Sequence, residues 1–244
     1  MIIQNTNFNI IYPRIQNLRR KIVEFEEKLS VYFLPSNILP IPDDAPEEIP
    51  RISMTTKNGH SILNLSLTGA SLTTNYDEVF RNSWKNCAEY LNDRVNNVYN
   101  ILDTLKQERF LFNGLSTQIL FDDTHDDPVS MIKERLLNLK TNANPYDLSC
   151  KVTFIYENNY YINITFENVR LYEGLITSLN SSLSSLEERA HVMGITLDVN
   201  DRYGFNYSKS YSSDYSKVQR IFNITTDIIN NKLGKLISEG VFEL

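Results

Sequence analysis

The hydrophobic pattern of residues 77–105 predicts a long helix around which the rest of the chain is organised. Its apolar residues recur every three or four positions and form a single stripe: Phe80, Trp84, Cys87, Leu91, Val95, Val98, Leu102 and Leu105. Asn75 and Glu78 have the spacing of a capping box, which predicts that the helix starts directly after them. A helix from Asp77 to about Leu105 would be as long as a compact chain of this size is wide, so we expect the other elements to pack along it.

The N-terminal residues predict a strand followed by an amphipathic helix. Weak alternation from Met1 to Tyr12 favours a short strand, and Pro13 takes the first position of a helix that ends near Phe33. The apolar residues of this helix share spacings of three and four: Ile15, Leu18, Ile22, Phe25, Leu29 and Tyr32. This stripe either packs on the body of the protein or forms a heptad seam that pairs with another subunit.

A proline-rich, acidic segment follows this helix. Five of the eight prolines lie between Pro35 and Pro50, interspersed with acidic residues, which favours an extended connector. The pattern therefore predicts three parts: an N-terminal strand and helical arm (1–34), the connector (35–50) and a larger body (51–244).

Alternating hydrophobicity predicts that this body contains an antiparallel sheet built from hairpins. The expected strands are a hairpin from Arg51 to Tyr76 that turns at Asn58–Gly59, a strand at 109–121, a hairpin of 146–156 with 160–171, and a strand at 194–200. Because the two faces of these strands differ in polarity, one face of the sheet is expected to be solvated.

Two further helices complete the predicted body. A short helix is expected from Pro128 to Leu139, and the last helix starts at the N-cap residue Asp214 and ends before Gly240. The Ser- and Leu-rich segment 174–190 fits either a weak helix or a mobile flap. This order of elements predicts an α+β fold, in which the antiparallel sheet packs against the long helix and the C-terminal helix.

Composition and charge narrow the classes of partner. With 244 residues, a net charge of −6 and a pI near 5.2, the chain lacks the basic footprint of a general nucleic-acid binder. Its only basic run, Arg14, Arg19, Arg20 and Lys21, is expected to cover the solvent face of the N-terminal helix. No apolar run approaches the roughly 18 residues that span a bilayer, and no signal-peptide pattern is present. The chain is therefore expected to be cytoplasmic, without a membrane partner.

One segment is a candidate for chemistry. The residues before Pro128 include five potential metal ligands: Asp122, Asp123, His125, Asp126 and Asp127. This group fits a divalent metal site, but acidic residues before a helix more commonly cap it and complement its dipole. Cys87 and Cys150 have the pattern of small buried hydrophobic residues. No phosphate loop or dinucleotide fingerprint is present, so no cofactor is expected.

Tyrosines recur every four positions before the last helix, at Tyr203, Tyr207, Tyr211 and Tyr215. The spacing fits either an extension of the helix or an exposed aromatic surface. Because tyrosine is enriched at protein interfaces, we treat this stripe as a candidate contact patch.

The layout from Pro50 onward carries a resemblance. Pro50–Arg51 enters the hairpin that turns at Asn58–Gly59, and the strand Leu63–Leu67 leads into the long helix. Later, Ile195–Val199 reads Ile-Thr-Leu-Asp-Val, and the closing helix ends at Leu236–Glu239. This layout resembles an uncharacterised, sporadically distributed family of bacterial proteins of similar length. The resemblance implies no settled activity, but it suggests a setting in a bacterial accessory or defence complex.

The sequence favours a non-enzymatic protein that binds another protein or a second copy of itself, through the N-terminal helix, the tyrosine stripe or both. The alternative is a metal-dependent hydrolase or nuclease centred on Asp122–Asp127. A third interpretation, a small-ligand sensor with a pocket between sheet and helix, has only the fold class to support it.

Overall fold

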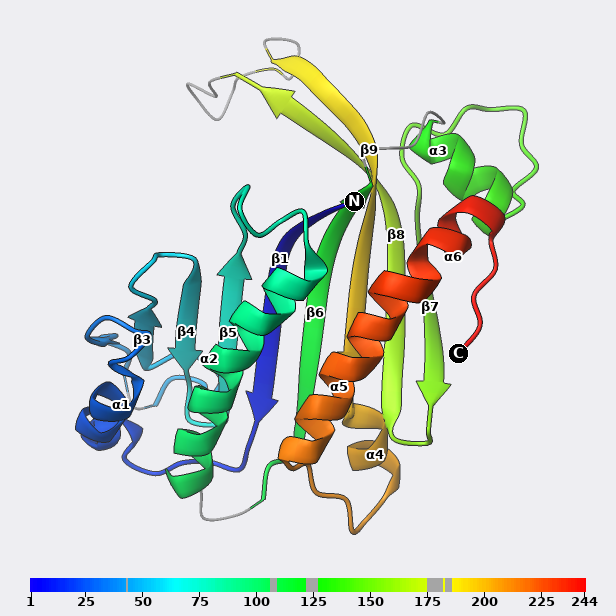
Figure 1. The fold of residues 1–244 in the computed structure, drawn as a ribbon. Coiled ribbons are helices and arrows are strands. Elements are labelled where there is room, and N and C mark those ends of the chain that lie inside the picture. The colour runs from blue at the N-terminus through cyan, green and yellow to red at the C-terminus, as the bar shows by residue number, and fades with distance from the viewer. Residues whose placement is uncertain (43, 106–108, 122–126, 175–181, 183–185) are drawn as a thin grey trace.

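The computed structural model describes residues 1–42, 44–105, 109–121, 127–174, 182 and 186–244. A nine-stranded antiparallel sheet forms one layer, and helices form a second layer on one of its faces (Figure 1). The strands are β1 (Ile2–Ile11), β2 (Asn37–Ile38), β3 (Ile52–Thr55), β4 (Ser61–Leu65), β5 (Gly69–Asn75), β6 (Phe112–Phe121), β7 (Ser149–Tyr156), β8 (Tyr160–Glu173) and β9 (Glu187–Asn200). The helices are α1 (Ile22–Leu29), α2 (Trp84–Leu105), α3 (Pro128–Met131), α4 (Arg202–Tyr207), α5 (Tyr215–Asp227) and α6 (Leu233–Glu239). The predicted α+β class is confirmed.

The strand order is β2-β3-β4-β5-β1-β6-β9-β8-β7. The N-terminal strand β1 lies in the middle, paired with β5 on one side and β6 on the other. Residues 1–12, which were expected in an N-terminal arm, therefore belong to the same sheet as the body. The two edges of the sheet are β2 and β7.

Alternation along each strand separates a buried face from a polar face. In β1, Phe8 and Ile10 are each 1% exposed and belong to the core beneath the helices. Asn7 and Asn9 alternate with them and point to the other face, where Thr73 of β5 lies opposite Asn7. One face of the sheet is thus covered by helices and the other is polar, as predicted.

Helix α2 and the C-terminal helix lie across the buried face (Figure 1). The C-terminal helix consists of α5, a π-helical turn (Ile228–Lys232) and α6. Side chains join it to α2: the Gln219 amide donates to the Asn92 oxygen at 2.9 Å, and the Trp84 indole donates to Thr226 Oγ1 at 2.9 Å. No helix among the described residues is long and apolar enough to cross a membrane.

The long helix starts later than the sequence predicted. Residues 78–82 form turns, and α2 begins only at Trp84. Asn75 is the last residue of β5, so the predicted capping box does not start a helix. The backbone after β5 instead pairs with the sheet, because the Ile3 N–H donates to the Arg81 carbonyl at 2.8 Å. A tertiary contact here overrides a local capping signal.

The N-terminal helix is also shorter than the predicted range 13–33. A 3-10 turn (Leu18–Lys21) leads into α1, which ends at Leu29. Asn17, before the turn, has a φ of 55°, a left-handed conformation that a continuous α-helix does not allow. The Ile15 N–H donates to the Leu67 carbonyl at 2.8 Å, so this segment is held by the strand connection after β4.

The predicted hairpin from Arg51 to Tyr76 contains three strands rather than two: β3, β4 and β5. The turn at Asn58–Gly59 joins β3 to β4 as predicted, and Gly59 has a φ of 76°. A second turn after Leu65 reverses the chain again, because the Ser66 N–H donates to the Gly69 carbonyl at 2.8 Å.

The capping signals of the C-terminal helix are confirmed. Asp214 accepts hydrogen bonds from the backbone N–H groups of Ser216 at 2.9 Å and Lys217 at 3.2 Å. At the other end, Gly240 has a φ of 71° and donates to the Leu236 carbonyl at 2.9 Å. These signals act within one helical turn, so tertiary structure does not disturb them.

Strand β9 begins at Glu187 and is longer than the predicted strand 194–200. The end of the segment 174–190, which was expected to form a helix or a flap, is therefore strand. Residues 175–181 and 183–185 lie outside the described residues. Beyond Glu167 and Met193, where pairing with β7 and β6 ends, β8 and β9 continue as a two-stranded arm that projects from the sheet (Figure 1).

Candidate functional site

Strand β7 forms one edge of the sheet and is built from residues that favour strands. Its sequence, Ser-Cys-Lys-Val-Thr-Phe-Ile-Tyr, is rich in β-branched and aromatic side chains. It pairs with β8 along its whole length, from Ser149 opposite Glu167 to Tyr156 opposite Tyr160, as the predicted hairpin required. The connecting turn contains left-handed residues, as tight hairpin turns do: Glu157 at φ 51° and Asn158 at φ 49°.

The outer side of β7 is unpaired. Within the described ranges, no backbone hydrogen bond joins β7 to a segment other than β8 and their shared turn. Val152 is 42% exposed and Ile155 is 54% exposed. The strand has a single charged residue, Lys151, and no proline. An exposed edge of this kind is a template for a further strand.

The N-terminal residues that were predicted as a possible seam are buried within the chain. Ile15, Leu18, Phe25 and Leu29 are at most 4% exposed, and Ile22 is partly buried against the same core. Their contacts are made inside this chain, so these side chains are not available to another subunit. The arrangement supports the first interpretation, a helix that packs on the body.

The tyrosine stripe is divided among three segments and does not extend the last helix. Tyr203 and Tyr207 lie in α4 with ring centroids 4.6 Å apart, and Tyr207 is 71% exposed. Tyr211 lies in the following loop and donates to Asp201 at 2.6 Å. Tyr215 is the first residue of α5. The exposed part of the predicted contact patch is therefore limited to α4.

The predicted metal ligands are described only at one position. Asp122, Asp123, His125 and Asp126 lie outside the described residues. Asp127 is the N-cap of α3 and accepts from the Ser130 N–H at 3.0 Å, while its other oxygen lies 3.4 Å from His191 Nδ1. In the part of the chain that the structure describes, no three His, Cys, Asp or Glu side chains gather as metal ligands would.

A buried carboxylate connects β6 to the loop between α4 and α5. Asp201 is 0% exposed and accepts from the Asn113 N–H at 2.5 Å, from the Tyr211 hydroxyl and from the Ser213 hydroxyl. Burial raises the pKa of Asp201, and the hydrogen bonds from Ser213, Tyr211 and Asn113 oppose that rise. Because the carboxylate is enclosed, its role is structural.

The two cysteines are free and have the character predicted from the sequence. Cys87 is 0% exposed, and burial raises the pKa of its thiol to about 12. Cys150 is partly buried, and burial also raises its pKa. Neither thiol is activated as a nucleophile, because activation requires a lowered pKa.

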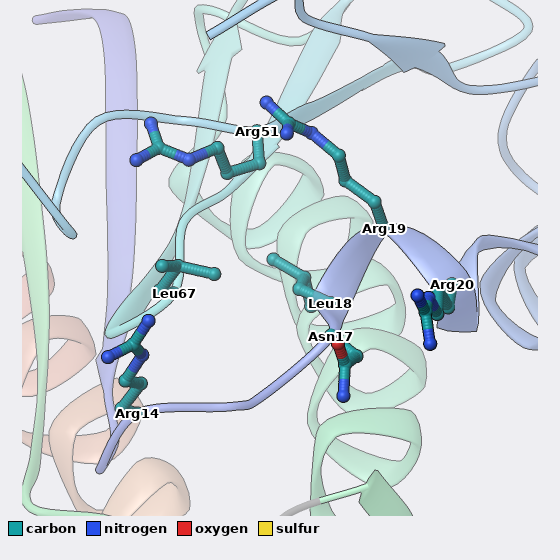
Figure 2. A pocket seen from close by; sticks show the side chains of 7 residues that line it. All are labelled: Arg14, Asn17, Leu18, Arg19, Arg20, Arg51 and Leu67. Atoms are coloured by element: carbon teal, nitrogen blue, oxygen red, sulfur yellow. The ribbon is translucent and has the colours of Figure 1, made fainter. Parts of the chain in front are cut away.

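A pocket of about 320 Å³ lies towards the other end of the sheet, near β3 and β4. Its lining residues come from three segments: Arg14, Asn17, Leu18, Arg19, Arg20, Arg51 and Leu67. In Figure 2, Arg19 extends from the 3-10 turn towards Arg51, and Arg14 lies beside Leu67. Arg20 lies on the outer side of the turn and points away from the other three. We call this site the arginine pocket.

The arginine pocket was not predicted from the sequence. Arg14, Arg19 and Arg20 were expected to cover the solvent face of a helix. Arg20 does face outward, but Arg14 precedes the helical residues, and Arg14 and Arg19 border a cavity. The available signal was a basic run in an acidic chain. Nothing in the sequence pattern connected that run to Arg51, which reaches the pocket from the start of β3.

Comparison of the chain with protein-family models, curated proteins and solved structures finds no match. The bacterial family resemblance of residues 50–244 therefore stays a prediction.

Proposed function

We propose that this chain is a non-enzymatic assembly subunit whose β7 edge pairs with β7 of a second copy. The observation that carries the proposal is the unpaired outer side of an eight-residue strand. Its outward N–H and C=O groups are hydrogen-bonding partners for an added strand.

The sequence of β7 is compatible with pairing to itself. In an antiparallel pair about a two-fold axis through Thr153, Lys151 faces Ile155 of the other copy, and Val152 faces Phe154. This register places no like charges opposite one another. With the axis perpendicular to the sheet, both copies keep their helices on the same face, so the two sheets become continuous.

The C-terminal residues cover one face of β7 but leave its edge open. The Phe242 ring lies 5.0 Å from the Phe154 ring, centroid to centroid. Among the described residues, no backbone hydrogen bond joins β7 to this segment. The core side of β7 is thus already packed, and a second copy would add to the edge without rearranging that core.

The test is the molar mass of the purified chain by size exclusion with light scattering. We expect the wild-type chain to be a dimer and the variant Ile155→Lys to be a monomer at the same concentration. The substitution places lysine opposite Lys151 of the other copy, twice in each dimer, and like charges in directly opposed positions destabilise a strand pair.

The matched control is Val79→Lys, which adds the same charge at a residue that is 75% exposed and distant from β7 in the sequence. This variant should remain a dimer. A wild-type chain that stays monomeric, or an Ile155→Lys variant that stays dimeric, would overturn the proposal.

A further inference from the structure

Arg51 is a buried cation without a carboxylate partner in the described part of the chain. The residue is 2% exposed, and its guanidinium donates to the carbonyl oxygens of Ile49 at 3.1 Å, Ala45 at 2.9 Å and Pro46 at 3.3 Å. These acceptors engage the two terminal nitrogens of the guanidinium but carry no net charge. Arginine is seldom fully buried without a counter-charge, because an unbalanced buried charge is costly. An arginine in this state on the wall of a pocket indicates an anion.

Of the three other arginines that line the pocket, Arg20 points away, and Arg14 and Arg19 are the two that concern this site. Arg19 donates to the carbonyl of Leu39 at 3.1 Å and to that of Ile41. Arg14 pairs with Glu47 at 3.0 Å, and the two side chains are 58% and 40% exposed. The connector carbonyls thus hold Arg19 and Arg51 in fixed positions, whereas Arg14 is held only by an exposed ion pair.

We propose that the arginine pocket binds the phosphate group of a small phosphate ester. Guanidinium groups bind phosphate oxygens through paired N–H donors, and several of them balance a dianion better than they balance a single carboxylate. The pocket volume of about 320 Å³ lies at the lower end of the range for small-molecule sites. The net charge of −6 disfavours a long polyanion such as nucleic acid.

Glu47 is a competitor for this ligand. Its carboxylate occupies Arg14 at the rim, so a bound phosphate must share Arg14 with it or displace it. Removing the carboxylate charge should therefore improve phosphate binding. This expectation separates a ligand site from a purely structural cluster, because a damaged fold does not produce a gain in affinity.

The experiment is isothermal titration calorimetry of the full chain with inorganic phosphate as the probe. We expect the wild-type chain to bind phosphate and to bind it more weakly as salt is added. Arg14→Gln should weaken binding by about tenfold, as expected for the loss of one charge-assisted interaction. Glu47→Gln should strengthen binding by up to about fivefold. Exposed ion pairs contribute up to about 1 kcal/mol, and this energy would no longer compete with phosphate for Arg14.

The matched control is Arg81→Gln. Arg81 forms an ion pair with Glu78 at 3.0 Å, similar to that of Arg14, but it does not line the pocket. Its replacement should leave the affinity for phosphate unchanged. Absence of phosphate binding by the wild-type chain would overturn the proposal. Acetate that binds as tightly as phosphate would overturn the assignment to phosphate.

This inference does not depend on the proposed dimer. The arginine pocket lies near β3 and β4, whereas β7 is the edge strand at the opposite end of the sheet. Ile155→Lys should therefore leave phosphate binding unchanged, and Arg14→Gln should leave the molar mass unchanged. Each proposal can fail while the other stands.

Discussion

The two edges of the sheet are constructed in opposite ways. The edge strand β2 has two residues and lies between Pro35 and Pro40, inside the connector (35–50), whose later residues are held by Arg19 and Arg51. The edge strand β7 has eight residues, no proline and a single charge. Short strands and neighbouring prolines are devices that prevent a further strand from adding to an edge.

This difference indicates that only one edge is blocked against pairing. At the β2 end, the N–H groups of the arginines bind connector carbonyls, so the backbone there has partners within the chain. At the β7 end, the exposed Val152 and Ile155 flank backbone groups that no described segment pairs with. The comparison therefore supports β7, and not β2, as the site of assembly.

The largest effect should come from removing the arginine that fixes the connector. Arg51→Met leaves three part-buried carbonyls without their donor, and we expect it to lower the free energy of unfolding by about 3 kcal/mol. Urea denaturation would measure this loss. If the connector protects the β2 edge, light scattering should also show association of this variant beyond a dimer.

The control for this change is Arg20→Met in the same pocket. Arg20 is exposed and points away from the connector, so the free energy of unfolding should change by no more than about 0.5 kcal/mol. If Arg51→Met and Arg20→Met lowered the free energy of unfolding equally, Arg51 would have no special role in holding the connector. The contrast between a blocked β2 edge and an open β7 edge would then be lost.

Local signals in the sequence predicted much of this fold. The Asp214 and Gly240 caps and the β7–β8 hairpin were correctly placed, because their partners lie within a few residues or one strand length. The capping box at Asn75 failed because that residue was taken into β5. The predicted N-terminal helix was too long, because the hydrophobic pattern did not reveal the left-handed conformation of Asn17.

The candidate sites were harder to predict than the elements. The pattern of β7 was visible, but its position at an edge depends on the order of all nine strands. The arginine pocket required Arg51 to meet residues about thirty positions earlier, which only the folded chain brings together. Conversely, Ile15 and Leu29 matched a seam pattern, yet the same pattern also describes a helix buried in its own core.

A smaller loss of stability is expected from a change in the middle of the sheet, where Asp201 binds Asn113 of β6. Asp201→Asn should lower the free energy of unfolding by about 2 kcal/mol, because the amide nitrogen that replaces one carboxyl oxygen cannot accept from the Tyr211 and Ser213 hydroxyls. The change lies between the two edges, so it should leave the molar mass of the folded chain unchanged. Urea denaturation and light scattering together would check this expectation.

The cost of Asp201→Asn should also depend on pH. Burial raises the folded-state pKa of Asp201, so the folded state binds the proton more tightly than the unfolded state does. The resulting stabilisation is complete below the unfolded pKa of about 3.9 and is lost as pH rises through the folded pKa. The stability difference between wild type and variant should therefore narrow as pH rises above about 4. A difference that widens would contradict the assigned direction.

The most direct test of the β7 dimer is a disulfide across its two-fold axis. In a Cys150→Ser background, Thr153→Cys places two cysteines opposite each other, at a Cα separation of about 5 Å that suits a disulfide. Lys151→Cys in the same background places its two copies about 14 Å apart, which is too far for a disulfide. We predict that mild oxidation converts the Thr153→Cys protein to a covalent dimer and leaves the Lys151→Cys protein monomeric on a non-reducing gel. Equal cross-linking of both variants, or of neither, would contradict the account.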